Sequence, residues 1–207
     1  MGGRHARLLA PVLTAALLLA GCASGTSEGT EHQGVHGTTL KAPFEAPATP
    51  LTDTDGAPYS LADQTDKPLT LLFFGYTNCP DVCQMVMANI ASALARLDEA
   101  ERADVDVVFV TTDPSRDDRK TLRRYLARFG DGLTGLTGDL DTIVDVARSF
   151  GVFMEHEAKL PTGGYDVSHS TNVFAIDADD ETPVTWRAET LPGDLAADIT
   201  HLLEADS

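Results

Sequence analysis

Residues 69–83 read LTLLFFGYTNCPDVC, an apolar run that passes directly into a polar turn and two cysteines. A run of this length is typical of a strand buried on both faces of a sheet. Apolar residues then recur at helical spacing over residues 83–97, and residues 105–110 form a second apolar run. Strand, helix and strand in this order predict a right-handed parallel crossover unit. The cysteines fall at the carboxyl end of the first strand, where open α/β sheets carry their chemistry.

The rest of the chain supplies further elements for the same domain. We expect helices over residues 114–129, 140–150 and 192–203, strands over 172–176 and 183–187, and a β-hairpin around Thr52–Gly56. Residues 152–170 lack such a pattern and predict a long loop, which in a compact domain is more often functional than idle. The order of elements predicts an α/β fold of the thioredoxin-like class, with a central mixed sheet flanked by helices and an N-terminal β-hairpin.

The overall composition is that of one globular unit. The 207 residues are 43% hydrophobic and 23% charged, which is enough apolar material to bury a core. Acidic residues number 32 against 15 basic ones, so the formal net charge is -17. A field of this sign repels phosphate backbones and argues against nucleic acid as a partner. This negative charge would instead attract metal cations or a basic face of another protein.

The first 21 residues are typical of an export signal. Basic residues precede an apolar stretch over residues 8–20, which is too short to cross the ~30 Å hydrocarbon layer of a membrane as a helix. The stretch ends in LAGC at residues 19–22, which looks like the lipobox of a bacterial lipoprotein. We therefore expect lipidation of Cys22 and an exported protein that is lipid-anchored to the outer face of the cell membrane. An ordinary secretory cleavage beside a chance cysteine is the alternative.

Residues 22–47 are rich in small and polar side chains and predict a flexible tether between the lipid anchor and a domain at 48–207. The tether contains His32 and His36, whose spacing allows a metal pair. Because nothing in a glycine-rich segment holds two side chains on one face, we favour solvated linker histidines.

Cys79 and Cys83 are the residues whose chemistry the sequence singles out. Four residues of helix advance ~6 Å and return to nearly the same face, so a pair on the first turn would lie toward the long end of the disulfide window of ~4.4–6.8 Å. With its sulfurs slightly farther apart the pair would hold a soft metal ion. A helix N-terminus stabilises the thiolate that both roles need. Two buried cysteines acting as small hydrophobic residues are the plain alternative.

A third ligand decides between redox and metal chemistry, and His169 is the candidate. It precedes the strand expected at 172–176, in a loop that faces the cysteine turn in a thioredoxin-like fold. Two thiolates and an imidazole make a soft trigonal site suited to copper(I), and an added oxygen ligand would accommodate copper(II). Taken alone, a histidine at the start of a strand is more often a hydrogen-bonded structural residue.

Three blocks of the sequence resemble the Sco/SenC family, which are copper chaperones for assembly of cytochrome c oxidase. The blocks are FGYTNCPDVC at 74–83, TDPSRD at 112–117 and HST at 169–171, and the resemblance covers roughly residues 50–205. It implies that Cys79, Cys83 and His169 are copper ligands. The implied recipient is the dinuclear copper centre of oxidase subunit II, or another cuproprotein. Some family members are thought also to reduce the recipient's cysteines, and the family's membrane-tethered topology matches the lipobox.

Asp113 matches a family aspartate near the copper site, where it would orient the ligands without binding the metal. Its other explanation is local, as the N-cap of a helix that starts at Pro114. Two positions depart from the family pattern: Gln84 replaces a proline, and Ser168 replaces the aspartate before the histidine. Neither position is a ligand, so we expect at most a shift in copper affinity or redox potential.

A thiol-disulfide oxidoreductase that uses Cys79 and Cys83 is the alternative function, and whether the protein is an enzyme depends on that choice. Such enzymes typically have two residues between the cysteines rather than three. They also have a cis-proline before the facing strand, where this chain has Ser170. We therefore favour a metallochaperone. A copper sensor or storage lipoprotein is a third interpretation, which the sequence does not separate from a chaperone.

Overall fold

The structure is a computed structural model that describes residues 2, 34–63, 67–152, 154 and 171–205. Met1–Glu31 and His32–Ser207 are two separate units, and every strand and helix described below belongs to the second. Among the described residues, no helix combines the length and the apolar character needed to cross a membrane.

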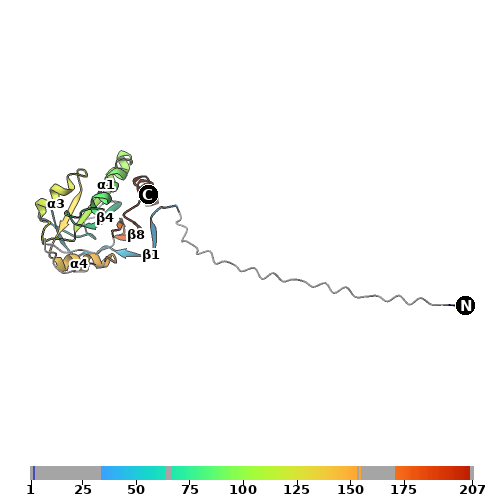
Figure 1. The fold of residues 1–207 in the computed structure, drawn as a ribbon, viewed down its shortest axis with the longest axis horizontal. Coiled ribbons are helices and arrows are strands. Elements are labelled where there is room, and N and C mark those ends of the chain that lie inside the picture. Colours follow the sequence, from blue (N-terminus) through green and yellow to red (C-terminus); the bar gives the residue numbers. More distant parts are fainter. Residues whose placement is uncertain (1, 3–33, 64–66, 153, 155–170, 206–207) are drawn as a thin grey trace. The chain divides into compact units, whose positions relative to one another are not determined.

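A mixed sheet forms the centre of the described part of the chain (Figure 1). Its strands are β1 (Thr38–Glu45), β2 (Leu51–Asp53), β3 (Pro58–Tyr59), β4 (Leu69–Gly75), β5 (Val105–Thr111), β6 (Thr134–Thr137), β7 (Val173–Asp177) and β8 (Glu181–Trp186). They are ordered β1-β8-β7-β4-β5-β6-β2-β3. The β4–β5 and β5–β6 pairs are parallel, and the other pairs are antiparallel. The predicted parallel crossover and the mixed sheet of the thioredoxin-like class are therefore confirmed.

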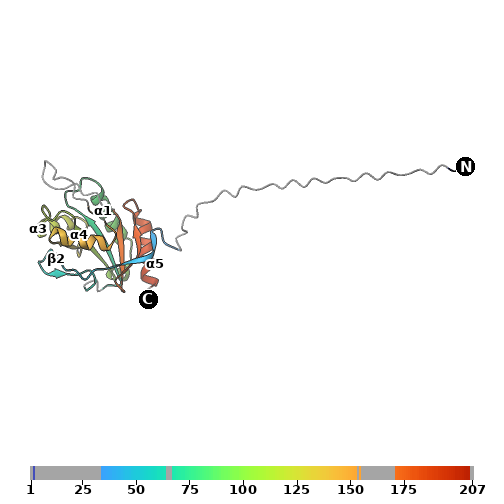
Figure 2. The same ribbon diagram turned by 90° about the horizontal axis from the view of Figure 1, so that it is seen from below.

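Helices cover both faces of this sheet. They are α1 (Val82–Leu94), α2 (Glu99–Ala103), α3 (Arg119–Leu126), α4 (Leu140–Ser149) and α5 (Pro192–Ala205). The buried side chains of α1, α3 and α5 share one hydrophobic core, and those of α4 share a second core with the opposite face. Figure 1 shows α4 on the other side of the sheet from α1 and α3, and Figure 2 shows β2 and α5 toward its opposite ends.

The central strand β4 is covered on both faces, which explains why its sequence does not alternate between apolar and polar residues. Leu71 and Phe73 pack in the core with α1 and α3, whereas Leu72 and Phe74 pack in the core with α4. All seven residues of the strand are buried. A strand covered on both faces is apolar at nearly every position, which is the pattern that identified it.

The predicted β-hairpin is also confirmed, as β2 and β3. Leu51 pairs with Tyr59 across it, and Gly56 in the turn has a φ of 94°, a region that favours glycine. The carboxylate of Asp53 accepts hydrogen bonds of 2.7–2.8 Å from three backbone amides of the turn. β2 also pairs with β6, so the hairpin extends the main sheet instead of standing in front of it.

The predicted tether at 22–47 is wrong at its C-terminal end. Residues 38–45 form β1, which pairs antiparallel with β8. The ring of Phe44 in this strand packs against Phe150 and Phe174, with centroids 6.5 and 6.3 Å apart. The composition of residues 38–45 did not predict a strand because they contain no apolar run. Backbone pairing with β8 and the ring of Phe44 hold β1 in place. Residues 22–33 lie outside the described part.

His36 belongs to the folded unit and is not a solvated linker histidine. Its Nδ1 lies 2.8 Å from the carboxylate of Asp198, and the amides of His36 and Gly37 donate to the same carboxylate. Asp198, on α5, is fully buried and also accepts from Nε1 of Trp186 at 2.7 Å. One buried carboxylate thus fastens the chain before β1 to α5 and β8. His32 lies outside the described residues.

Other expectations need smaller corrections. The helix predicted over 114–129 begins only at Arg119, where the carboxylate of Asp118 caps it by accepting from the amide of Thr121 at 2.7 Å. The short elements β6 and α2 were not predicted, because a few residues carry no measurable periodicity. The remaining predicted strands and helices are present with ends shifted by a few residues.

Candidate functional site

Cys79 and Cys83 lie where the chain leaves β4 and enters α1. Gly75 ends β4 beside Thr111, the last residue of the parallel strand β5. The amide of Cys79 donates to the carbonyl of Tyr76 at 3.2 Å, which closes a turn. Cys83 belongs to the first turn of α1, whereas Cys79 precedes the helix. The assumption that both cysteines share the first helical turn is therefore only half right.

A hydrogen bond nevertheless brings the two cysteines together. The amide of Cys83 donates to Sγ of Cys79 at 3.3 Å. The side chain of the N-cap residue Asp81 caps no amide, so this sulfur takes the role that a capping oxygen usually has. An amide donor and a helix N-terminus both stabilise negative charge on sulfur. Both cysteines are free, so the pair is chemically available for a disulfide or a metal ion.

Both thiols are buried, Cys83 completely and Cys79 to all but 4%. Burial raises the pKa of the Cys83 thiol above its ordinary value of 9.0, and the hydrogen bond with Cys79 raises it further. Cys83 therefore keeps its proton at neutral pH until a metal ion or an oxidant displaces it.

Gly75 makes room for the sulfur of Cys83. A Cβ atom at residue 75 would lie 3.2 Å from that sulfur and 2.9 Å from the ring of Phe73. Both distances are shorter than ordinary van der Waals contact. The glycine at the end of β4 is thus required by the close approach of the rings of Phe73 and Phe109 as well as that of the thiol.

Asp117 ties the cysteine loop to β5. Its carboxylate is fully buried and accepts hydrogen bonds from the amide of Thr77 at 2.8 Å, the hydroxyl of Thr77 at 2.5 Å and the hydroxyl of Thr111 at 2.7 Å. Because Thr77 lies two residues before Cys79, this carboxylate helps to set the position of the first thiol. Asp117 ends the TDPSRD block at 112–117, and no local pattern in the sequence signals this role.

Asp113 is buried in the loop that follows β5, and its contacts are local. Its carboxylate accepts from the hydroxyl of Ser115 at 2.6 Å and from Nε of Arg116. Its backbone carbonyl accepts from the amides of Arg116 and Asp117. It therefore stabilises the turn that presents Asp117. It is not the N-cap of α3, so that expectation is wrong, and its role beside a metal stays a prediction.

His169 and Cys22 lie outside the described residues. Among the residues that the structure does describe, no three His, Cys, Asp or Glu side chains gather closely enough to hold a metal ion. The strand that follows His169 in the sequence, β7, begins with Val173 paired to Phe73, at the cysteine end of β4. The structure therefore brings together two of the three predicted ligands and leaves the third as a prediction.

A family model described as SCO1/SenC matches residues 37–204. Among solved structures, apo Sco1 from Thermus thermophilus is similar with a TM-score of 0.74 and 29% identity, covering 84% of this chain and 99% of that one. ScoI from Bradyrhizobium japonicum with copper bound gives 0.67 and 30%, covering 76% and 99%. BsSco, a member of the Sco family of cytochrome c oxidase assembly proteins with an identified disulfide switch, gives 0.61 and 25%, covering 80% and 98%.

Curated relatives include a putative copper-binding protein from Stutzerimonas stutzeri, which is 32% identical over 129 residues. That match covers 58% of this chain and 62% of the relative. The chain spans about half the length of the curated relatives it matches.

Proposed function

The chain belongs to the SCO1/SenC family, and we propose on that basis that it is a membrane-tethered copper chaperone. It takes up one copper ion and delivers it to the dinuclear copper centre of cytochrome c oxidase subunit II. A thiol-reducing step on the recipient's cysteines accompanies this role. Copper is the cargo in this scheme, and the protein supplies the ligands that hold and release it.

The observation that carries the proposal is the Cys79–Cys83 pair at the end of β4. The amide of Cys83 donates to the sulfur of Cys79 at 3.3 Å, and neither cysteine is in a disulfide, so both sulfurs are available as ligands. Two thiolates at a helix N-terminus are soft ligands that suit copper(I). The likeness to a copper-bound ScoI at 30% identity supports copper over other soft ions.

His169 is the proposed third ligand. A neutral imidazole would complete a trigonal copper(I) site with the two thiolates, and one more oxygen ligand would accommodate copper(II). The pairing of Val173 with Phe73 supports the assignment, because it brings the start of β7, which follows His169 in the sequence, to the end of β4 that leads into the cysteines.

The tether is the remaining part of the proposal. Lipidation of Cys22 would anchor the exported domain to the outer face of the cell membrane. The described fold already includes residues 34–45, so the proposed tether is shorter than residues 22–47.

Copper titration of the reduced protein tests the proposed function. We expect one copper per monomer, and a thiolate-to-copper(II) charge-transfer band when copper(II) is bound. Cys79→Ser, Cys83→Ser and His169→Ala should each abolish tight binding. His201→Ala is the matched control, because His201 is an exposed histidine on α5. Loss of binding in the control, or tight binding in all three variants, would contradict the ligand set.

A thiol-disulfide oxidoreductase is the second candidate function, and the closeness of two free thiols favours it. The likeness to BsSco, for which a disulfide switch is identified, points the same way. The two functions differ in their need for His169. If His169→Ala binds copper as firmly as the wild type while the protein exchanges disulfides rapidly with a test substrate, the oxidoreductase function is correct.

A further inference from the structure

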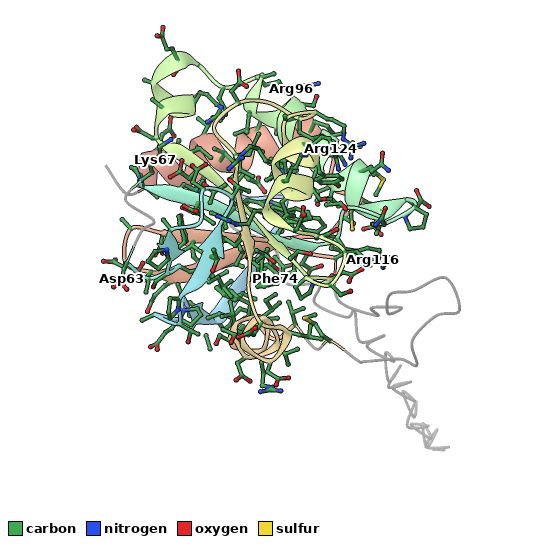
Figure 3. All side chains as sticks on the ribbon, turned by 90° about the vertical axis from the view of Figure 1, so that its left-hand side faces the viewer. Asp63, Lys67, Phe74, Arg96, Arg116 and Arg124 are labelled. Atoms are coloured by element: carbon green, nitrogen blue, oxygen red, sulfur yellow. The ribbon has the colours of Figure 1, made fainter. Side chains whose placement is uncertain are left out.

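The basic residues of this acidic protein are unevenly distributed. The chain has only 15 lysines and arginines against 32 acidic residues, yet six of the 15 fall within residues 116–128. Helix α3 within this segment carries four basic residues and no acidic one. Figure 3 labels two members of the segment, Arg116 and Arg124, on one side of the ribbon, with Asp63 and Lys67 on the other in this view. The negative net charge of the whole chain predicts a basic partner, whereas helix α3 is positively charged and would attract an acidic one.

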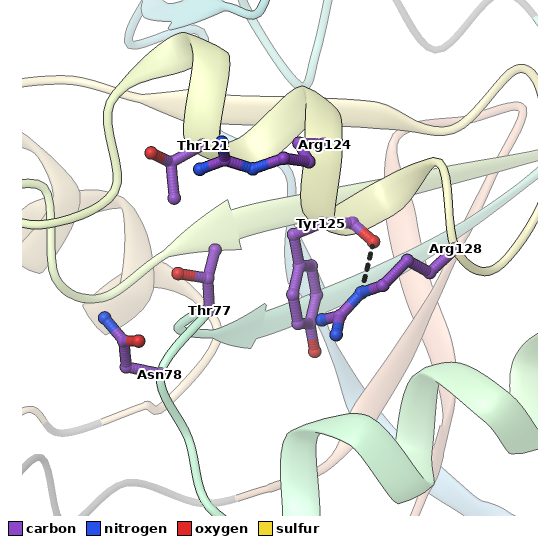
Figure 4. Close-up of a pocket in the computed structure, with 6 residues that line it drawn as sticks. All are labelled: Thr77, Asn78, Thr121, Arg124, Tyr125 and Arg128. Atoms are coloured by element: carbon purple, nitrogen blue, oxygen red, sulfur yellow. Dashed lines mark hydrogen bonds between the residues drawn. The ribbon is translucent and has the colours of Figure 1, made fainter.

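A pocket joins this basic segment to the cysteine loop. It has a volume of about 300 Å³ and is lined by Thr77 and Asn78 from the loop and by Thr121, Arg124, Tyr125 and Arg128 from α3 and the turn after it. Figure 4 shows Thr77 and Asn78 opposite the side chains of α3. Asn78 directly precedes Cys79. A group bound in this pocket therefore lies beside the residue that precedes the first cysteine.

The polar groups of the pocket are suited to an anion. The guanidinium of Arg128 lies 4.5 Å from the ring centroid of Tyr125, which holds it against the pocket wall. Among the described residues, neither Arg124 nor Arg128 forms an ion pair, whereas Arg116 pairs with Asp113 and Arg123 with Asp55. Within the pocket, Arg124 and Arg128 are thus the two guanidinium groups without an ion-pair partner, and Nε of Arg128 donates to the carbonyl of Tyr125 at 3.3 Å (Figure 4).

Tyr125 forms part of the wall of this pocket. Its side chain is only 4% exposed, and its hydroxyl is buried without a hydrogen-bond partner within the described part of the chain. Because that oxygen is itself inaccessible, a group in the pocket meets the guanidinium groups of Arg124 and Arg128 and not the tyrosine hydroxyl. Two guanidinium groups match the acceptor oxygens of a carboxylate.

We propose that this pocket binds a carboxylate on an acidic face of the copper recipient, and that this contact places the recipient against the Cys79–Cys83 loop. The inference rests on the proposed function and adds the chemistry of the partner's surface. Exposed basic residues continue from the pocket along α3 through Arg119 and Lys120, which gives a charged face wider than a single small anion needs. Asp55 and Asp118 lie beside these residues, and Asp55 is paired with Arg123, so basic groups remain in excess. Such a face steers a partner of opposite charge and raises its association rate.

Copper transfer to a defined recipient tests this inference. The donor is the copper(I)-loaded full chain in nanodiscs of zwitterionic lipid, and the recipient is the copper-free soluble domain of oxidase subunit II from the same organism. Arg124→Glu with Arg128→Glu should lower the second-order rate constant for transfer by about tenfold or more at low ionic strength, and by less as salt is added. Replacement of both arginines by lysine should restore the long-range attraction and therefore only part of the rate, because the charge is kept while the guanidinium contacts are lost.

The matched control reverses two charges elsewhere. Lys41→Glu on β1 and Arg148→Glu on α4 give the same net charge, at the other edge and on the other face of the sheet. At about 0.15 M ionic strength the control should change the rate by less than about twofold, since exposed charges farther away than the Debye length of about 8 Å are screened. Copper stoichiometry, and transfer from each variant to a small chelator, should equal those of the wild type.

The possible outcomes separate this inference from the proposed function. If the wild type transfers no copper to subunit II, the proposed function fails. If it transfers copper and the Arg124/Arg128 variant is equally fast, or the control is equally slow, the docking pocket is refuted. If the variant loses only its attraction to discs of anionic lipid, the basic face contacts the membrane and the inference is wrong.

Discussion

The carboxylate of Asp117 holds both the amide and the hydroxyl of Thr77, at 2.8 and 2.5 Å. Because Thr77 leads into the first cysteine, this pair links the end of β5 to the thiol loop on β4. A third bond, from the hydroxyl of Thr111, fixes the same carboxylate from β5 itself. The position of the thiol loop thus depends on one buried acid.

Replacement of Asp117 should loosen that loop. Asp117→Ala leaves the amide of Thr77 and the hydroxyls of Thr77 and Thr111 without this partner, and we expect it to lower the free energy of unfolding by about 2–3 kcal/mol. It should also speed hydrogen exchange at the Thr77 amide. Asp118→Ala is the neighbouring control, which loses only the cap of α3 and should destabilise the protein less. Urea unfolding and hydrogen exchange measure both effects. Unchanged exchange at Thr77 in Asp117→Ala would refute the link.

Gly75→Ala tests the close approach of Cys83 to the strand. The added methyl would lie 3.2 Å from Sγ of Cys83, so we expect a loss of about 1–3 kcal/mol and weaker copper binding. Gly193→Ala on α5 is the control, because a Cβ there meets no atom within 4 Å. A chemical denaturation series compares the two. Equal stability of the two variants would show that the sulfur does not need this space.

The pH dependence of stability should report the His36–Asp198 contact. The hydrogen bond to Asp198, together with the charges of Asp198 and Asp194, raises the pKa of His36 above 6.5 in the folded state. A raised pKa means that the folded protein binds the proton more tightly than the unfolded chain does. The contribution is therefore fully present below pH 6.5 and is lost as the pH rises through the higher folded-state pKa.

The urea midpoint of the wild type, measured from pH 5.5 upward, should fall relative to that of His36→Gln over this range. The effect should be small, because half of the His36 side chain is exposed to solvent. Parallel curves for the two proteins would contradict this role of His36.

Copper binding should release a proton from Cys83. Burial raises the pKa of this thiol, so it is protonated in the copper-free protein at neutral pH and must lose its proton to coordinate. The affinity should therefore weaken as the pH falls. Calorimetry of the wild type in buffers of different ionisation enthalpy counts the protons released, and at pH 7 the count should include the proton of Cys83. A copper affinity that stays constant from pH 8 to pH 5 would count against thiol and imidazole ligands.

Much of the fold follows from local pattern. The apolar runs of β4 and β5, the periodicity of α1 and α4, and the Asp53–Gly56 turn each carry a signal in a few adjacent residues. The cysteine pair could be predicted for the same reason, since its place between the end of β4 and the first turn of α1 is defined by adjacent residues. These features could be predicted because no distant contact is needed to define them.

The predictions for β1 and His36 were wrong because both depend on contacts between residues far apart in the sequence. β1 forms because β8 offers a free edge, and His36 is ordered because Asp198, 162 residues later, is buried beside it. Asp117 acts on a loop 40 residues earlier, so its role emerges only once β4 and β5 are side by side. The pocket around Tyr125 likewise combines a loop and a helix that the sequence separates.

X-ray absorption at the copper edge of the copper(I)-loaded full chain tests the central claim most directly. We expect two sulfur ligands and one nitrogen ligand in the wild type, and this three-ligand signal should be absent from His169→Ala and from each cysteine variant after the same copper loading. A wild-type spectrum with fewer than two sulfurs, or a His169→Ala spectrum identical to the wild type, would contradict it.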